Sequence, residues 1–145
     1  MVNLFSKLYK MALASGKAEK IADSVLSSHG KILLISIRDW NGNILAVKYR
    51  EAFTKRFSGA SRLIGTKYSG SLIISTLSLA NEAKDVFGEA QAIITIYKDL
   101  KVMLLPMPLY ELIVGLALET SAADKEEEIH NIANEVERLM AADTL

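Results

Sequence analysis

The chain has 145 residues, half of them hydrophobic and 23% charged, which fits one packed domain and excludes extensive disorder. It contains no cysteine, which excludes disulfides, thiolate catalysis and cysteine-bound zinc or iron, and which is typical of a cytoplasmic protein. Lysine plus arginine and aspartate plus glutamate number 17 each, so no overall charge attracts the chain to nucleic acid or to an acidic membrane.

The first predicted element is an N-terminal helical segment over residues 1–29, because apolar side chains recur there at helical spacing. We expect a helix from Asn3 to Ser28, bent or broken near Gly16 and stopped by Gly30. The start of the segment has some features of a secretory signal. Lys10 interrupts its apolar stretch, however, so a packed helix is favoured.

Two strands joined by a tight turn give the clearest local signal in the chain. Strands are expected over residues 31–38 and 44–49, because both stretches are rich in branched apolar residues. Between them lies Asn41-Gly42, a step that readily adopts positive φ angles. A tight hairpin turn is therefore predicted at this step.

The next connection, over residues 50–68, has no clear periodicity, and irregular structure with a short helix is expected there. Positive charges gather in and just before it, interleaved with aromatic residues and opposed only by Glu51. These charges, called the basic patch below, are Lys48, Arg50, Lys55, Arg56, Arg62 and Lys67. They form a candidate site for an anionic partner. A solvated loop whose aromatic residues enter the core is the alternative.

A second helix is expected from Ser71 to Phe87, where apolar residues recur every three or four positions. Ser69 or Ser71 is the candidate N-cap, since a hydroxyl oxygen can accept a bond from an unpaired N–H group of the first turn. Gly88 stands where a helix commonly ends.

Three strands follow, over residues 90–98, 101–105 and 110–118, each rich in branched or aromatic side chains. Pro106 is expected at a strand end, because proline cannot donate a hydrogen bond to a neighbouring strand. The most apolar span, residues 100–118, is long enough to cross a bilayer, but it holds two prolines, a lysine and a glutamate. No transmembrane segment is therefore predicted.

The last predicted element is a C-terminal helix over residues 121–142, with Ser121 or Asp124 as its cap and three consecutive glutamates in its first turn. The full order of elements is then α-β-β-α-β-β-β-α. A single five-stranded antiparallel sheet flanked by helices satisfies this order, so the predicted fold class is α+β, in one domain over residues 1–145.

This order of elements resembles the roadblock/LC7 family, which has a profilin-like fold. More narrowly, Gly42–Ala46 followed by Tyr49-Arg50-Glu51, and Met107–Val114 ahead of an acidic helix, are similar to small uncharacterised archaeal proteins of that type. The resemblance implies a non-catalytic homodimer, often a regulator or scaffold of a small GTPase. It also implies dimerisation by packing of the second helix and edge pairing of the third strand. The interface residues so implied are Leu72, Ser75, Leu79, Gln91, Ile93, Thr95 and Tyr97.

Candidate residues for catalysis or metal binding are few. The two histidines, His29 and His130, belong to separate predicted elements, which leaves little material for a histidine metal site or a catalytic triad. Asp39, Asn41 and Asn43 alternate as calcium ligands do, but the glycine and the glutamate that such a loop requires are missing, so a turn is favoured. We expect no enzyme activity, no cofactor and no metal site.

Two other functions stay open. The first is a small-molecule sensor that holds a ligand against the sheet, in a pocket lined by Ile35, Val102 or Ile113. The second is an anion-binding module that uses the basic patch, although the sequence carries no strong signal for nucleic acid. The leading hypothesis is a cytoplasmic, homodimeric adaptor or GTPase regulator.

Overall fold

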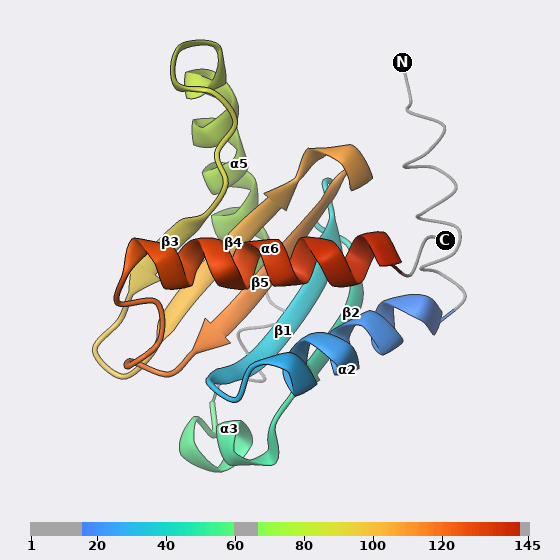
Figure 1. Ribbon diagram of the computed structural model, residues 1–145, viewed down its shortest axis with the longest axis vertical. Helices are drawn as coiled ribbons and strands as arrows, with labels where there is room; N and C mark the ends of the chain where they lie inside the picture. Colours follow the sequence, from blue (N-terminus) through green and yellow to red (C-terminus); the bar gives the residue numbers. More distant parts are fainter. Residues whose placement is uncertain (1–15, 60–66, 143–145) are drawn as a thin grey trace.

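The computed structural model describes the backbone of residues 16–59 and 67–142, and the side chains of these residues except 67–69, 71 and 72. The described residues form a five-stranded antiparallel sheet with helices on both faces (Figure 1). The strands lie in the order β2-β1-β5-β4-β3. They are β1 (Ile32–Asp39), β2 (Ile44–Tyr49), β3 (Ile93–Ile96), β4 (Lys101–Met107) and β5 (Leu112–Leu118). The α+β fold class and the predicted order of elements are confirmed.

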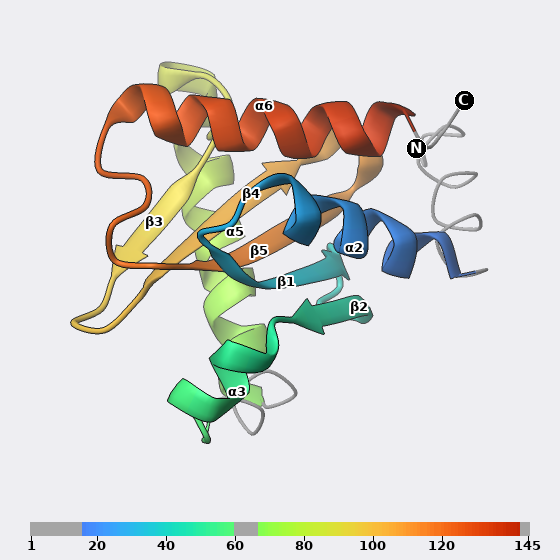
Figure 2. The ribbon, with the colours of Figure 1, turned by 60° about the horizontal axis from the view of Figure 1, so that its bottom comes forward.

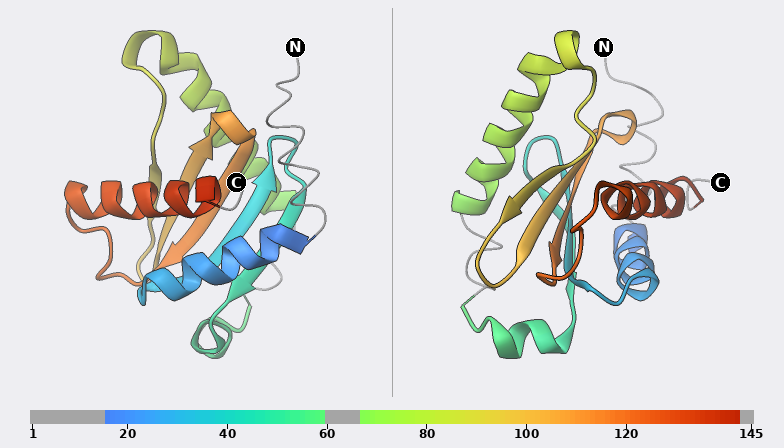
Figure 3. Two further views of the ribbon diagram at one scale, coloured as in Figure 1. Left: turned by 45° about the vertical axis from the view of Figure 1, so that its right-hand side comes forward. Right: turned by 60° about the vertical axis from the view of Figure 1, so that its left-hand side comes forward.

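The helices divide between the two faces of the sheet. Helices α2 (Ala18–Ser28) and α6 (Glu126–Ala142) lie side by side over one face, and α5 (Lys67–Phe87) lies on the other (Figure 3). The short helix α3 (Glu51–Arg56) follows β2 and lies beyond its end (Figure 2). A single 3-10 turn, η2 (Pro108–Tyr110), connects β4 to β5. Both faces of the central strands are therefore covered.

The main core lies between the sheet and the pair α2 and α6. Ile35, Leu116 and Met103 occupy neighbouring positions on three adjacent strands, and each is 0–1% exposed. Val25 of α2 and Val136 of α6 belong to the same buried cluster. All seven residues of β5 are buried, as expected for a central strand with helices on both sides. Each fully buried Leu or Ile contributes about 1.5–3 kcal/mol, so this layer accounts for much of the stability.

The turn between β1 and β2 differs from the predicted one. Gly42 has a positive φ of 88°, whereas Asn41 does not. The N–H of Gly42 donates to the carbonyl of Asp39, and the register of the two strands shifts between Ile37 and Arg38. The loop is a four-residue turn closed by a left-handed glycine next to a bulge, not a two-residue turn in which both Asn and Gly are left-handed.

Helix α5 begins earlier than predicted. Because its first residue is Lys67, Ser69 and Ser71 lie inside the helix, and the prediction that one of them caps it was wrong. The predicted stop is confirmed, since Gly88 has a φ of 83° and its N–H donates to the carbonyl of Lys84 at 2.8 Å.

The strands after α5 also differ in their limits. β3 has four residues, well inside the predicted range 90–98. β4 continues through Pro106, which is paired in register with Ile113, so this proline lies within the strand and not at its end. β5 begins at Leu112 and not at Tyr110, because Tyr110 belongs to η2 and the left-handed Glu111 separates that turn from the strand.

The expected interruption of the first helix at Gly16 is confirmed, whereas the expected capping of the last helix is wrong. The predicted first helix is broken at Gly16, whose φ is 99°, and α2 begins two residues later; its predicted part in residues 1–15 lies outside the described residues. Helix α6 begins at Glu126, so Ser121 and Asp124 lie before the N-cap position. Asp124 instead accepts a hydrogen bond from the buried Lys101 side chain.

Candidate protein-interaction surface

The outward side of α5 carries an exposed apolar stripe. At 100° per residue, Ser75, Leu79 and Val86 fall on one side of the helix, opposite Ile73 and Leu77. Ile73 is buried against β4 and β5, and Leu77 packs on the same cluster. Leu79 and Val86 are 68% and 77% exposed. Large apolar side chains grouped on an outward face are typical of a protein-binding surface.

The strand β3 lies at the edge of the sheet beside this helix. Among the described strands, β3 pairs with β4 alone, so its other edge faces outward. Ile96 at the end of β3 is 73% exposed. An edge strand presents N–H and C=O groups that can pair with the strand of another molecule. The edge of β3 and the stripe on α5 thus offer two neighbouring means of association.

The C-terminal end of α5 projects past the sheet (Figure 1). Phe87 falls near the inward side of the helix by its angular position, yet it is 84% exposed, because no strand lies beneath it. With Val86 it extends the apolar surface beyond the sheet edge. The sequence prediction missed both residues, although Val86 already lay outside the inward periodicity of this helix.

The predicted interface residues separate into several groups. Ser75 and Leu79 lie on the outward stripe of α5, and Thr95 is exposed on β3. Ile93 is half-buried and packs beneath α5, so it belongs partly to the core. The two others with described side chains flank β3: Gln91 lines a cleft on the α6 side, and Tyr97 is 43% exposed just after the strand. The side chain of Leu72 lies outside the described residues.

No protein-family model matches the chain, and no curated protein does. Solved structures do match. MglB of Myxococcus xanthus superposes with a TM-score of 0.61 at 8% identity, covering 87% of this chain and 93% of that chain. The gliding protein MglB of Thermus thermophilus gives 0.58 at 11% identity, covering 89% of each chain. The roadblock/LC7 domain of Streptomyces avermitilis gives 0.57 at 10% identity, covering 84% and 90%.

This chain has the roadblock fold. The prediction made from the order of elements is confirmed at that level. The identity is too low to carry more than the fold, and the predicted similarity to archaeal proteins of this type stays a prediction.

Within this roadblock fold, the four cations of the basic patch whose side chains are described each contact a carboxylate or carbonyl of the chain itself. Lys48 lies 3.9 Å from Glu19, and Lys55 lies 3.2 Å from Glu51 on the next turn of α3. The Arg56 guanidinium makes two contacts. Its Nη1 donates to the Glu119 carboxylate at 2.7 Å, and its Nη2 donates to the carbonyl of Asp99. The side chains of Arg62 and Lys67 lie outside the described residues.

Arg50, the remaining member of the basic patch, has an internal role. Its guanidinium donates to the carbonyls of Leu26 and His29 at the end of α2, and to that of Ile32 at the start of β1. The last carbonyls of a helix have no partner within it, and a nearby cation also interacts well with the helix dipole. Arg50 therefore holds α2 to the sheet.

The three residues expected beside a small ligand lie on both faces of the sheet. Ile35 lies on the face beneath α2 and α6, whereas Val102 and Ile113 lie on the face beneath α5. A ligand pocket could therefore be lined by Ile35 or by Val102 and Ile113, and the small-molecule sensor stays a prediction. Two clefts in the described part of the chain, one beside Leu105 and Met107 and one beside Ile32 and Val136, are lined by none of the three.

The histidines and the turn residues make local contacts only. His29 follows α2, and its Nδ1 accepts from the N–H of Lys31 at 3.3 Å; His130 is exposed, with Nε2 3.4 Å from Glu126. The Asp39 carboxylate accepts from the N–H groups of Asn41 and Asn43 at 2.9 Å each, as a turn residue does. No three His, Asp or Glu side chains converge on one point in the described ranges. No described helix has the length and apolarity needed to cross a bilayer.

Proposed function

We propose that this chain is a non-catalytic regulator or scaffold that works by binding proteins, as a homodimer, with a small GTPase as its partner. The observation that carries the proposal is the exposed apolar stripe on α5 beside the outward edge of β3. The roadblock fold adds support, because the family that the sequence resembles often regulates or scaffolds small GTPases. The scarcity of histidine and the lack of cysteine in the sequence favour a non-catalytic role.

The proposed dimer joins two copies through the same elements of each. Paired along β3, two sheets become one continuous antiparallel sheet, and the two α5 helices come to lie against each other on the same face. Ser75 and Ser78 are exposed on α5, and such small side chains let two helices approach closely. A two-fold axis places each interface residue twice in the contact, so single substitutions have a doubled effect.

The dimer is tested by the substitution Leu79→Glu. Burying the exposed part of Leu79 contributes about 1–2 kcal/mol in each copy, hence about 2–4 kcal/mol per dimer. Loss of that burial weakens dimerisation about 30-fold to 1,000-fold, and two facing glutamates repel each other in addition. Analytical ultracentrifugation across micromolar concentrations measures the change. The matched control is Ile44→Glu, since Ile44 is 42% exposed but lies on β2, at the opposite edge of the sheet from β3. A wild-type chain that stays monomeric at these concentrations contradicts the dimer.

The GTPase partner is tested separately. Purified small GTPases from the same cell, loaded with GDP or with a non-hydrolysable GTP analogue, are titrated against the chain while binding is followed by interferometry. We expect binding that depends on the nucleotide state. Binding that is equal in both nucleotide states removes this part of the proposal. So does a lack of detectable binding at about 100 μM, a concentration on the order of the dissociation constants of the weakest functional contacts.

A further inference from the structure

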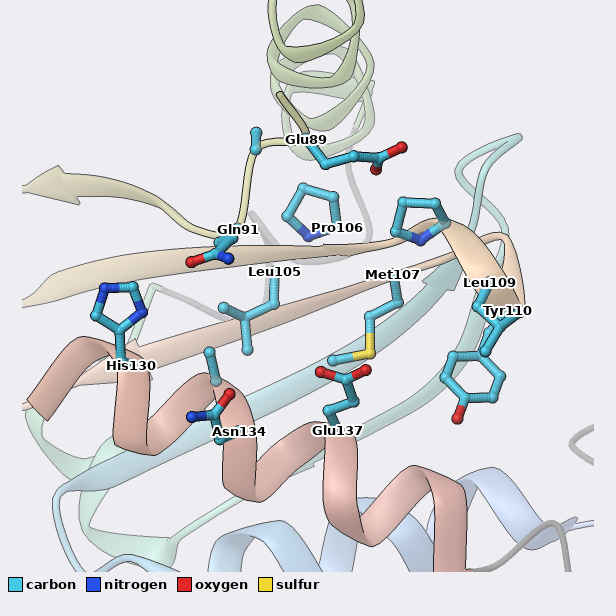
Figure 4. A pocket seen from close by; sticks show the side chains of 13 residues that line it. Glu89, Gln91, Leu105, Pro106, Met107, Leu109, Tyr110, His130, Asn134 and Glu137 are labelled. Carbon is cyan, nitrogen blue, oxygen red and sulfur yellow. The ribbon is translucent and has the colours of Figure 1, made fainter. Parts of the chain in front are cut away.

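A cleft of about 180 Å³ lies on the α6 side of the sheet, opposite to α5. Three segments that are distant in sequence enclose it: residues 89–91 before β3, residues 105–110 at the end of β4 and in η2, and residues 130–137 of α6 (Figure 4). The side chains of Leu105 and Met107 point from β4 into the space between strand and helix and form an apolar floor (Figure 4).

The rim of this cleft is negatively charged. Glu89 stands on the β3 side and Glu137 on the α6 side (Figure 4), and the residues that line the cleft include no Lys or Arg. None of the ion pairs among the described residues involves either carboxylate. Burial raises the pKa of Tyr110, which lines the same cleft, and the charge of Glu137 raises this pKa further. The negative potential of Glu137 therefore reaches into the cleft.

The size and the chemistry of the cleft select the ligand. Its volume is below the range of about 300–1,000 Å³ typical of pockets for small molecules, and it suits one long side chain. An apolar floor between two carboxylates matches a lysine or arginine, whose aliphatic stem packs on apolar surface while its charged head stays at the rim. Leu109, exposed beside the cleft, extends the apolar surface and offers a contact to a neighbouring apolar residue.

We propose that this cleft docks a basic segment of a partner protein, with one arginine or lysine side chain between Glu89 and Glu137 and an adjacent apolar side chain on Leu109. The site uses neither the stripe on α5 nor the edge of β3, so it goes beyond the proposed homodimer. Gln91, assigned to the dimer interface from the sequence, is part of this second surface.

The test uses a capped pentapeptide with one arginine between two leucines and alanine at each end. It is titrated into the full chain while amide chemical shifts are followed by NMR. We expect saturable shifts concentrated at residues 89–91, 107–110 and 130–137. The same peptide with citrulline in place of arginine keeps the shape without the charge, and we expect it to bind at least about fivefold more weakly.

The charge pair is tested in the protein with the double variant Glu89→Gln and Glu137→Gln, which we expect to bind the arginine peptide about fivefold to thirtyfold more weakly. The matched control, Asp23→Asn with Glu127→Gln, removes the same charge at exposed positions outside the cleft and is expected to bind normally. Undiminished binding by the first variant, or shifts centred elsewhere, overturns the proposal. So does equal affinity for the single-residue N-acetyl-arginine amide, because the cleft then takes a small cation and not a protein chain. Neither result bears on the oligomeric state.

Discussion

Gly115 in the middle of β5 is the position where the smallest added group has the largest expected effect. It pairs in register with Ser36 of β1, and a Cβ at position 115 would lie 2.7 Å from the Ser36 Oγ and 3.4 Å from a terminal carbon of Leu104. Real Cβ atoms do not tolerate the first of these distances, so either the hydroxyl must turn away or the two strands must shift. Gly115→Ala therefore forces a change in the centre of the sheet.

We expect Gly115→Ala to lower the free energy of unfolding by about 1–3 kcal/mol, the usual cost of adding a carbon to a packed core. Alanine also reduces the entropy of the unfolded chain, which stabilises the fold by about 0.4–1 kcal/mol. The net loss in the free energy of unfolding therefore lies in the lower half of that range. At roughly 3 °C per kcal/mol, the melting temperature falls by about 2–6 °C.

The assay is urea unfolding followed by far-UV circular dichroism, on the wild type, Gly115→Ala, Ser36→Ala and the double variant. Because Ser36→Ala removes the atom that the new Cβ meets, the double variant should recover most of the loss, with a coupling energy of about 1 kcal/mol. If Ser36→Ala leaves the cost of the new methyl unchanged, the contact between β1 and β5 is not its cause. A single variant as stable as the wild type refutes the reasoning altogether.

Three further predictions concern the polar contacts that fix the ends of the helices. Lys101→Met removes a buried Nζ that donates to the Ala122 carbonyl at 2.7 Å, and should lower the free energy of unfolding in urea by about 1–3 kcal/mol. The hydrogen bond from Lys101 lowers the pKa of Asp124 in the folded chain, so the Asp124 carboxylate stabilises the fold above about pH 4 and this stabilisation is lost as pH falls. In a plot of melting temperature against pH, Asp124→Asn should therefore reduce the fall on the acid side. Arg50→Lys places one ammonium where a guanidinium reaches three carbonyls, and should raise the hydrogen-exchange rates of the last turn of α2 at least about fivefold.

The elements that the sequence could predict are those whose signal is local. The branched runs of β1 and β2 and the stop at Gly88 depend on intrinsic preferences of a few neighbouring residues, and the structure agrees with them. The start of α5 was missed because Ser69 and Gly70 are poor helix formers, so propensity placed the boundary several residues too late.

The sites were harder to predict, because they depend on contacts between residues distant in sequence. Arg50 reads as a loop cation in the sequence, and its bonds to the end of α2 join residues more than 20 positions apart. Lys101 looks like an ordinary strand-end lysine until it is paired with Asp124, which stands beyond the next strand. The cleft combines three segments over nearly 50 positions, from Glu89 to Glu137, and no pattern within any one of them indicates it.

The shortness of β3 has a consequence for how partners could be chosen. Four residues offer few backbone bonds to a second molecule, and backbone bonds are indifferent to side-chain identity. In the proposed dimer, such a seam would fix the angle at which two subunits meet and would contribute little to the strength or the specificity of their association. The affinity and the specificity of the association would then depend on the solvent-facing residues of α5, which can vary freely because they do not pack against the sheet. Related proteins could change from homodimers to heterodimers by substitutions on this one helix.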